Sequence, residues 1–101
     1  MTRYRMSDNT IVDTKNATAE WDEMRRSDGS NMIGCSSGSQ WLDQSLYRSR
    51  KGRYYTVTYS RIQGRPDHAE WISNEEAARW FLLNNIELPA NLAKLESEVS
   101  E

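Results

Sequence analysis

The stretch Gly34 to Gly38 has the spacing of G-x-S-x-G, the turn that presents the nucleophilic serine of α/β-hydrolases. In those enzymes the serine lies between a buried strand and a helix, and an acidic residue and a histidine follow later in the chain. Here the residues directly after Gly38 do not predict a helix, and His68, the only histidine, lies in a predicted turn. We therefore interpret this stretch as a loop of small residues, and a small serine hydrolase using Ser36 is a remote alternative.

Cysteine and histidine can also act together as a thiolate–imidazole pair. Because the chain has one of each, only the fold could bring Cys35 and His68 together, and an idle or buried cysteine is the simpler interpretation. No cluster of cysteine, histidine or carboxylate residues has the spacing of metal ligands. The acidic residues around Glu20 and Glu75 fit a helix start or a solvated face. The sequence thus predicts no enzyme, no cofactor, and no catalytic or metal-binding residue.

The candidate binding surface is a hairpin at about 46–61, in which cations and tyrosines surround Gly52. Arginine and lysine can neutralise an acidic partner, and tyrosine rings offer stacking planes, as in proteins that bind single-stranded nucleic acid. Charges on a strand also discourage edge-to-edge pairing, so a plain outer face is the competing interpretation. The candidate partner-binding residues are Arg48, Arg50, Lys51, Arg53 and Tyr54.

Charge is unevenly distributed along the chain, although the net charge is only −2. Residues 44–66 contain six cations and no acid, whereas residues 67–101 contain eight acids and two cations. If the acidic C-terminal third lay over the basic hairpin, the two charges would cancel at close range. We therefore expect weak or no binding to nucleic acid, and the sequence leaves open whether the hairpin is exposed or covered.

The chain of 101 residues is long enough for one domain with its own core, expected over residues 1–95, with a frayed acidic tail at 96–101. Only 37% of the residues are hydrophobic, so the four tryptophans and five tyrosines must supply much of the core. Cys35 is alone, which excludes a disulfide within the chain. No stretch resembles a membrane span or a secretory signal, and we expect a cytoplasmic protein.

The best-defined elements lie in the middle of the chain. Residues 44–50 and 53–62 predict two antiparallel strands joined at Lys51-Gly52, because glycine supplies the positive φ of a tight hairpin. A third strand is predicted at 70–72. The expected core face of the second strand carries Tyr55, Val57 and Tyr59, which places Tyr54 on the outer face.

Two helices are predicted to follow. Ser73 to Glu76 fits the S-x-x-E capping box, so the first helix should run from about 74 to 84 and end at Asn84-Asn85. Pro89 suits the first turn of a second, shorter helix at about 89–96.

The N-terminal half is less clearly patterned. Two short extended segments flank the turn residues Ser7-Asp8-Asn9. Residues 15–26 fit a helix or a strand, because only Trp21 and Met24 are strongly apolar there. Residues 27–39 have loop composition, with room for a short strand at 31–33.

Several motifs together resemble a group of small bacterial proteins of unassigned function. Their pattern is D-T-x-x-A, then L-Y-x-[ST]-x-x-G-R-[YF]-[YF], then S-x-E-E-A-x-x-W. The resemblance covers residues 11–83, implies that 19–26 forms a strand after a turn, and carries no activity or ligand. The matching residues are Asp13, Thr14 and Ala17; Leu46, Tyr47 and Ser49; Gly52, Arg53, Tyr54 and Tyr55; and Ser73, Glu75, Glu76, Ala77 and Trp80.

Together these patterns predict an α+β fold, with a small antiparallel β-meander of four to five strands and the helix at 74–84 packed on one face. For function they favour a non-catalytic interaction module that uses the hairpin toward an acidic partner protein. Nucleic-acid binding through the same hairpin is the alternative, and self-association is left open. The predicted core residues are Val12, Trp21, Leu46, Tyr55, Val57, Tyr59, Trp71, Ile72, Phe81 and Leu82.

Overall fold

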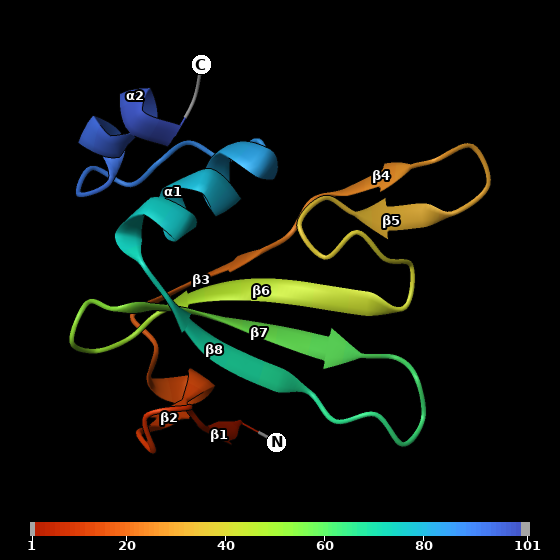
Figure 1. The fold of residues 1–101 in the computed structure, drawn as a ribbon, viewed down its shortest axis with the longest axis horizontal. Coiled ribbons are helices and arrows are strands. Elements are labelled where there is room, and N and C mark those ends of the chain that lie inside the picture. Colours follow the sequence, from red (N-terminus) through yellow and green to blue (C-terminus); the bar gives the residue numbers. More distant parts are fainter. Residues whose placement is uncertain (1, 100–101) are drawn as a thin grey trace.

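A computed structural model describes residues 2–99 and shows an α+β fold with antiparallel sheets and two short helices (Figure 1). The predicted single meander of four to five strands is wrong, because the described residues form eight strands in three sheets. The elements are β1 (Arg3–Arg5), β2 (Ile11–Asp13), η1 (Thr14–Asn16), β3 (Ala19–Asp22), β4 (Arg25–Ser27), β5 (Met32–Gly34), β6 (Leu42–Arg48), β7 (Tyr54–Ser60), β8 (His68–Ile72), α1 (Asn74–Leu83), η2 (Ala93–Leu95) and α2 (Glu96–Val99).

The central sheet has the strand order β3-β6-β7-β8, and all neighbours are antiparallel. Its last three strands are a meander, as predicted, and β3 lies along the outer edge of β6 with Trp21 opposite Leu46. The other two sheets are local hairpins, β1-β2 and β4-β5. Each hairpin closes on a turn whose aspartate, Asp8 or Asp28, accepts hydrogen bonds from backbone amides two or three residues later.

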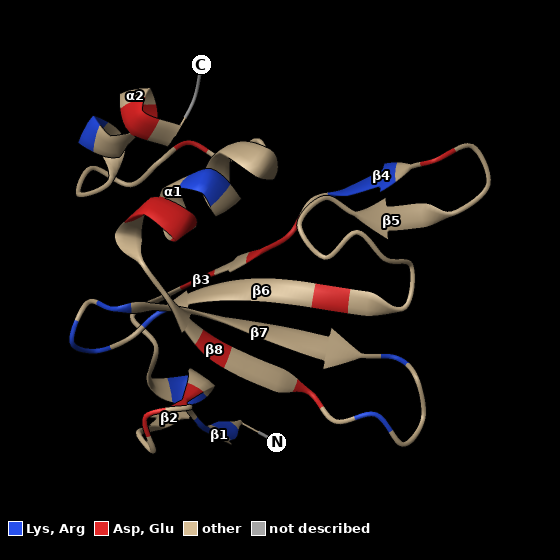
Figure 2. Cartoon of the chain, in the orientation of Figure 1, with Lys and Arg blue, Asp and Glu red and all other residues tan. Residues whose placement is uncertain are grey.

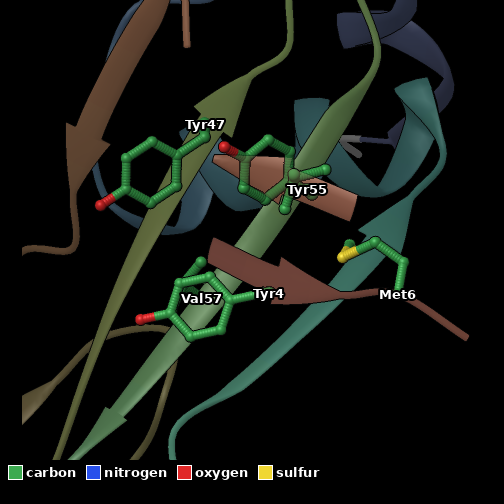
Figure 3. Close-up of a cluster of buried hydrophobic side chains, with 6 residues drawn as sticks. Tyr4, Met6, Tyr47, Tyr55 and Val57 are labelled. Atoms are coloured by element: carbon green, nitrogen blue, oxygen red, sulfur yellow. The ribbon is translucent and has the colours of Figure 1, made fainter. Parts of the chain in front are cut away.

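The central sheet is covered on both faces, which divides the core into two clusters. Alternate residues of a strand point to opposite faces, so odd-numbered side chains of β6 and β7 meet the β1-β2 hairpin and even-numbered ones meet α1. The first cluster, much of it shown in Figure 3, consists of Tyr4, Met6, Val12, Tyr47, Tyr55 and Val57. The second consists of Leu46, Tyr54, Ala77, Trp80, Phe81 and Leu92.

Tyr54 was expected on an outer face, and this prediction is wrong. Its side chain is only 1% exposed, because α1 and the segment after it cover that face of β7. The Tyr54 hydroxyl donates to Asn91 Oδ1 at 3.3 Å and accepts from Asn91 Nδ2 at 3.2 Å. A buried phenol with a satisfied hydroxyl is part of the core and is not a stacking surface.

The capping box predicted at the start of α1 is confirmed. The Glu76 amide donates to Ser73 Oγ, and the Ser73 amide donates to Glu76 Oε1, both at 3.1 Å. The helix ends where predicted: Asn85 adopts a φ of 58°, and the buried Asn84 side chain accepts from the Met24 amide at 2.9 Å. Asn84 therefore both ends the helix and ties it to the connection between β3 and β4.

The second helix lies further along the chain than residues 89–96. From Pro89 the backbone forms hydrogen bonds between residues three apart, as in a 3₁₀-helix. The Leu92 amide donates to the Pro89 carbonyl and the Leu95 amide to the Leu92 carbonyl, each at 2.9 Å. Leu92, which takes part in both of these turns, is completely buried. Residues 96–99, predicted as part of a frayed tail, form α2, and residues 100 and 101 lie outside the described part of the chain.

The choice between helix and strand for residues 15–26 falls on the strand. The segment starts with the single turn η1, which the Asp13 side chain caps by accepting from the Lys15 amide, and continues as β3 and β4.

Five of the ten predicted core residues are buried, and the other five are partly buried. The core residues that the sequence did not single out include Tyr4, Met6, Tyr47, Tyr54, Trp80 and Leu92.

Phe81 tests the second core cluster. Its ring is fully buried, with the Trp21 ring edge-on to it at a centroid distance of 4.8 Å. Phe81→Ala should lower the free energy of unfolding by ~3–5 kcal/mol, the range for large aromatic residues in cores. Ser73→Ala should cost only ~0.5–2 kcal/mol through the lost cap. Urea denaturation measures both, and a cost for Phe81→Ala no larger than that of the exposed control Leu83→Ala would contradict this packing.

Candidate functional site

A groove of about 530 Å³ lies between the N-terminal hairpin and the loop that joins β6 to β7. One wall is formed by residues 10–13, which include all of β2, and the other by residues 49–51. Tyr55 and Trp71, on the face of the central sheet that the hairpin covers, contribute aromatic surface. Two segments about forty residues apart in the sequence therefore face each other across one concave surface.

The groove is strongly cationic. Arg3, Arg50, Lys51 and Arg53 line it, and Asp13 is the one carboxylate among its lining residues. Arg50 and Lys51 are exposed and form no ion pair within the described residues 2–99. Figure 2 shows these cations at the end of the β6-β7 hairpin and on β1. Two positive charges are thus available to an incoming group.

The loop between β6 and β7 holds its cations at a fixed tip. The strands end at Arg48 and start again at Tyr54, so the predicted turn at Lys51-Gly52 is a longer loop over residues 49–53. It closes through hydrogen bonds from the Ser49 amide to the Arg53 carbonyl, at 2.7 Å, and from the Gly52 amide to the Ser49 carbonyl, at 2.9 Å. Gly52 has a φ of 84°, which a side chain would strain.

A cluster of three side chains joins the two hairpins at the end of the groove. The Arg53 guanidinium stacks on the Trp71 ring at 3.8 Å from its centroid. Asp8, in the N-terminal turn, accepts from Trp71 Nε1 at 3.3 Å and lies 3.8 Å from Arg53 Nη1. Hydrogen bonds from Thr10, together with those of Trp71 and the charge of Arg53, lower the pKa of Asp8. The Asp8 carboxylate is therefore charged at neutral pH and holds the turn against β8.

Asp13 is the counter-charge inside the groove. A hydrogen bond from the Lys15 amide, with further contributions from Thr2 and Arg3, lowers the pKa of Asp13. Its nearest cation is Arg3, with Nε 3.4 Å from Asp13 Oδ2, so this pair leaves Arg50 and Lys51 uncompensated. Burial raises the pKa of Tyr55 to about 12, so its phenol is neutral at physiological pH.

The structure brings together three of the five predicted partner-binding residues. Arg50, Lys51 and Arg53 line the groove, whereas Arg48 and Tyr54 do not. Arg48 and Tyr54 are paired across β6 and β7 and share the side-chain direction of Leu46, toward α1, because side chains alternate along a strand. Arg3 was missed, since nothing in its local sequence connects it with a loop almost fifty residues away.

The acidic C-terminal third does not cover the cationic tip of the basic hairpin. Helix α1 carries Glu75 and Glu76 in its first turn and packs on the face of the sheet opposite the groove (Figure 2). Arg50, Lys51 and Arg53 are exposed, and within residues 2–99 the one ion pair that they form is that of Arg53 with Asp8. The tip of the hairpin is therefore exposed, whereas α1 covers one face of its two strands.

The G-x-S-x-G stretch binds a carboxylate of the protein itself. Glu23, only 9% exposed, accepts hydrogen bonds from the amides and hydroxyls of Ser36 and Ser37, at 2.9–3.1 Å, and from the Gln44 amide at 2.7 Å. A Cβ at Gly34 would overlap the same carboxylate, which explains the glycine. The Ser36 hydroxyl thus donates to Glu23, whereas His68 is exposed at the start of β8, where it pairs with Glu70.

Within residues 2–99, no group of three or more histidine, cysteine, aspartate or glutamate residues is placed to hold a metal ion. None of the described helices is long and apolar enough to cross a membrane. Comparison with protein-family models, with curated proteins and with solved structures finds no match to this chain. The groove is therefore the feature on which a functional argument can rest.

Glu23 and the serine loop give a stability prediction. Glu23→Gln places an amide donor where five donors converge, so we expect a loss of ~1–3 kcal/mol in the free energy of unfolding, as for buried groups left without partners. Ser36→Ala removes one donor and should cost ~0.5–1.5 kcal/mol. Chemical denaturation measures both, with the exposed Glu87→Gln as control. A larger loss for Ser36→Ala than for Glu23→Gln would contradict a structural role for this carboxylate.

Proposed function

We propose that this protein is a non-catalytic interaction module that binds an acidic partner protein in the groove between β2 and the β6-β7 loop. The observation that carries the proposal is the pair of exposed, uncompensated cations, Arg50 and Lys51, on the wall of a concave surface with an aromatic floor. Its volume of about 530 Å³ is within the range of known ligand sites. A cytoplasmic location, which the lone Cys35 supports, is part of the proposal.

The composition of the groove favours a protein partner over nucleic acid. Proteins that bind single strands present open aromatic faces to the bases. Here the Trp71 face is occupied by Arg53, and Tyr54 is buried. The groove also contains apolar side chains, Ile11, Val12 and Ala17, and the carboxylate of Asp13, which suit a polypeptide better than a run of phosphates. Engagement of Ser36 with Glu23 supports the non-catalytic part of the proposal.

Fluorescence anisotropy with a labelled oligo-glutamate peptide tests the proposal. We expect measurable binding that weakens as salt is added, because exposed charges are screened. Arg50→Gln combined with Lys51→Gln should weaken binding by between about twofold and about thirtyfold, given ~0.2–1 kcal/mol for each of the two exposed ion pairs.

The matched control is Arg65→Gln combined with Lys94→Gln, which removes the same charge from exposed residues outside the groove. This variant should bind like the wild type. Equal losses in the two double variants would show that net charge alone attracts the peptide, and the groove would then have no specific role.

Titration with a single-stranded oligonucleotide tests the nucleic-acid alternative. We expect weak or no binding, because the groove offers few free cations and no open stacking face. If the alternative were right, Arg50→Gln with Lys51→Gln would flatten the dependence of log K on log salt by about 1.4, at ~0.7 per phosphate contact. Submicromolar, salt-steep binding by the wild-type protein would favour nucleic acid over an acidic protein.

A further inference from the structure

We propose that the acidic partner binds as an extended segment that adds a strand to the free edge of β2. This inference rests on the proposed function and deepens it, because it specifies both the conformation of the partner and the backbone groups that hold it.

The hydrogen bonds of the N-terminal hairpin fix which way the β2 backbone points. The Met6 amide donates to the Thr10 carbonyl, and the Thr14 amide donates to the Thr2 carbonyl, both at 2.8 Å. In an antiparallel ladder, hydrogen-bonded pairs recur at every second residue, so Tyr4 and Val12 form the pair between them.

The residues between these pairs have their backbone groups turned outward. Ile11 and Asp13, opposite Arg5 and Arg3, therefore direct their N–H and C=O groups away from β1. Within residues 2–99, β2 pairs with β1 alone. Its outer edge thus offers the N–H and C=O groups of Ile11 and the N–H group of Asp13, in the spacing that an added strand requires. The Asp13 carbonyl is at the N-cap of η1, where it accepts the first hydrogen bond of that turn.

This free edge borders the groove. Residues 10, 11, 12 and 13 all line it, although their side chains alternate between the two faces of the hairpin. Consecutive residues line one surface when a strand presents its edge to it. The inner strand, β1, contacts β8, so the edge of β2 lies on the side away from β8, toward the β6-β7 loop (Figure 1).

The opposite wall selects an acidic occupant. A strand added to β2 would run between the edge and the loop that carries Arg50 and Lys51. At ~3.3 Å per residue, β2 offers about 10 Å of edge, which suits a short extended segment. Acidic side chains at alternate positions of that segment would reach the two free cations, and apolar ones would meet Ile11, which is 59% exposed. Charge complementarity therefore points to an acidic peptide in β conformation.

N-methylated peptides test this mode of binding with the wild-type protein. The probe is a labelled peptide of alternating glutamate and valine, compared with two isomers methylated on every glutamate nitrogen or on every valine nitrogen. Alternate N–H groups of a strand face opposite edges, so one isomer loses the donors that face β2 and the other keeps them. We expect the isomer that loses the donors facing β2 to bind at least about tenfold more weakly than the unmethylated peptide. The isomer that keeps these donors should bind nearly as well as the unmethylated peptide.

Amide hydrogen exchange gives a second, independent readout. The amides of Ile11 and Asp13 should exchange more slowly once the unmethylated peptide is bound, whereas the Val12 amide, already bonded within the hairpin, serves as the internal control. Equal affinities of the two isomers, without protection of Ile11 and Asp13, would overturn strand addition. Protection of these amides in the free protein that grows with protein concentration would also overturn it, because a second copy would then occupy the edge.

These outcomes are distinguishable from failure of the proposed function. If the alternating peptide binds and Arg50→Gln with Lys51→Gln weakens it, the acidic partner site stands whichever isomer binds. If the alternating peptide binds in this way but the two methylated isomers bind equally well, only the strand-addition inference is lost. If no acidic peptide binds at all, the proposed function fails and the inference fails with it.

Discussion

The structure depends on the burial of strand β7 on both of its faces. Tyr55 and Val57 pack toward the N-terminal hairpin and Tyr54 packs toward α1, and each of the three is at most 1% exposed. A sheet that bears apolar side chains on both faces needs two covers, because large aromatic residues left in water would forfeit most of their stabilising burial. The chain provides these covers from its two ends, which explains why short N-terminal strands and a short capped helix suffice.

The groove follows from how the first cover is attached. The β1-β2 hairpin lies over the sheet near β7 and β8, and the Asp8–Arg53–Trp71 cluster holds its turn in place. The hairpin does not fill the space beside the β6-β7 loop, and a concave surface lies between them. The loop carries cations because its tip is solvated, and the second cover, on the opposite face, leaves that charge exposed.

The buried carboxylate of Glu23 binds the serine loop to the start of β6, at the other end of the sheet. It gathers amides and hydroxyls from the serine loop and from the start of β6, which would otherwise be unpaired in a partly buried position. The stretch Gly34 to Gly38, which matches the sequence pattern of a nucleophile elbow, therefore stabilises the fold here by binding Glu23. A short motif of this kind implies catalysis only within its strand and helix context.

The sequence by itself determined the elements whose signals are local. The capping box at Ser73, the glycine turn at Gly52 and the β-branched and aromatic residues of β7 act through neighbours a few residues away, and each element formed where predicted within a few residues. All ten apolar residues chosen for the core are at least partly buried for the same reason. Three of the groove cations were found because they are close together in the chain.

Only the tertiary structure decided which face of each strand is covered, so the place of Tyr54 in the core and the direction of Arg48 could not be read from alternation alone. It alone brought Arg3 and the β2 edge opposite the loop, because contacts between segments forty residues apart arise from packing and leave no mark on either local sequence.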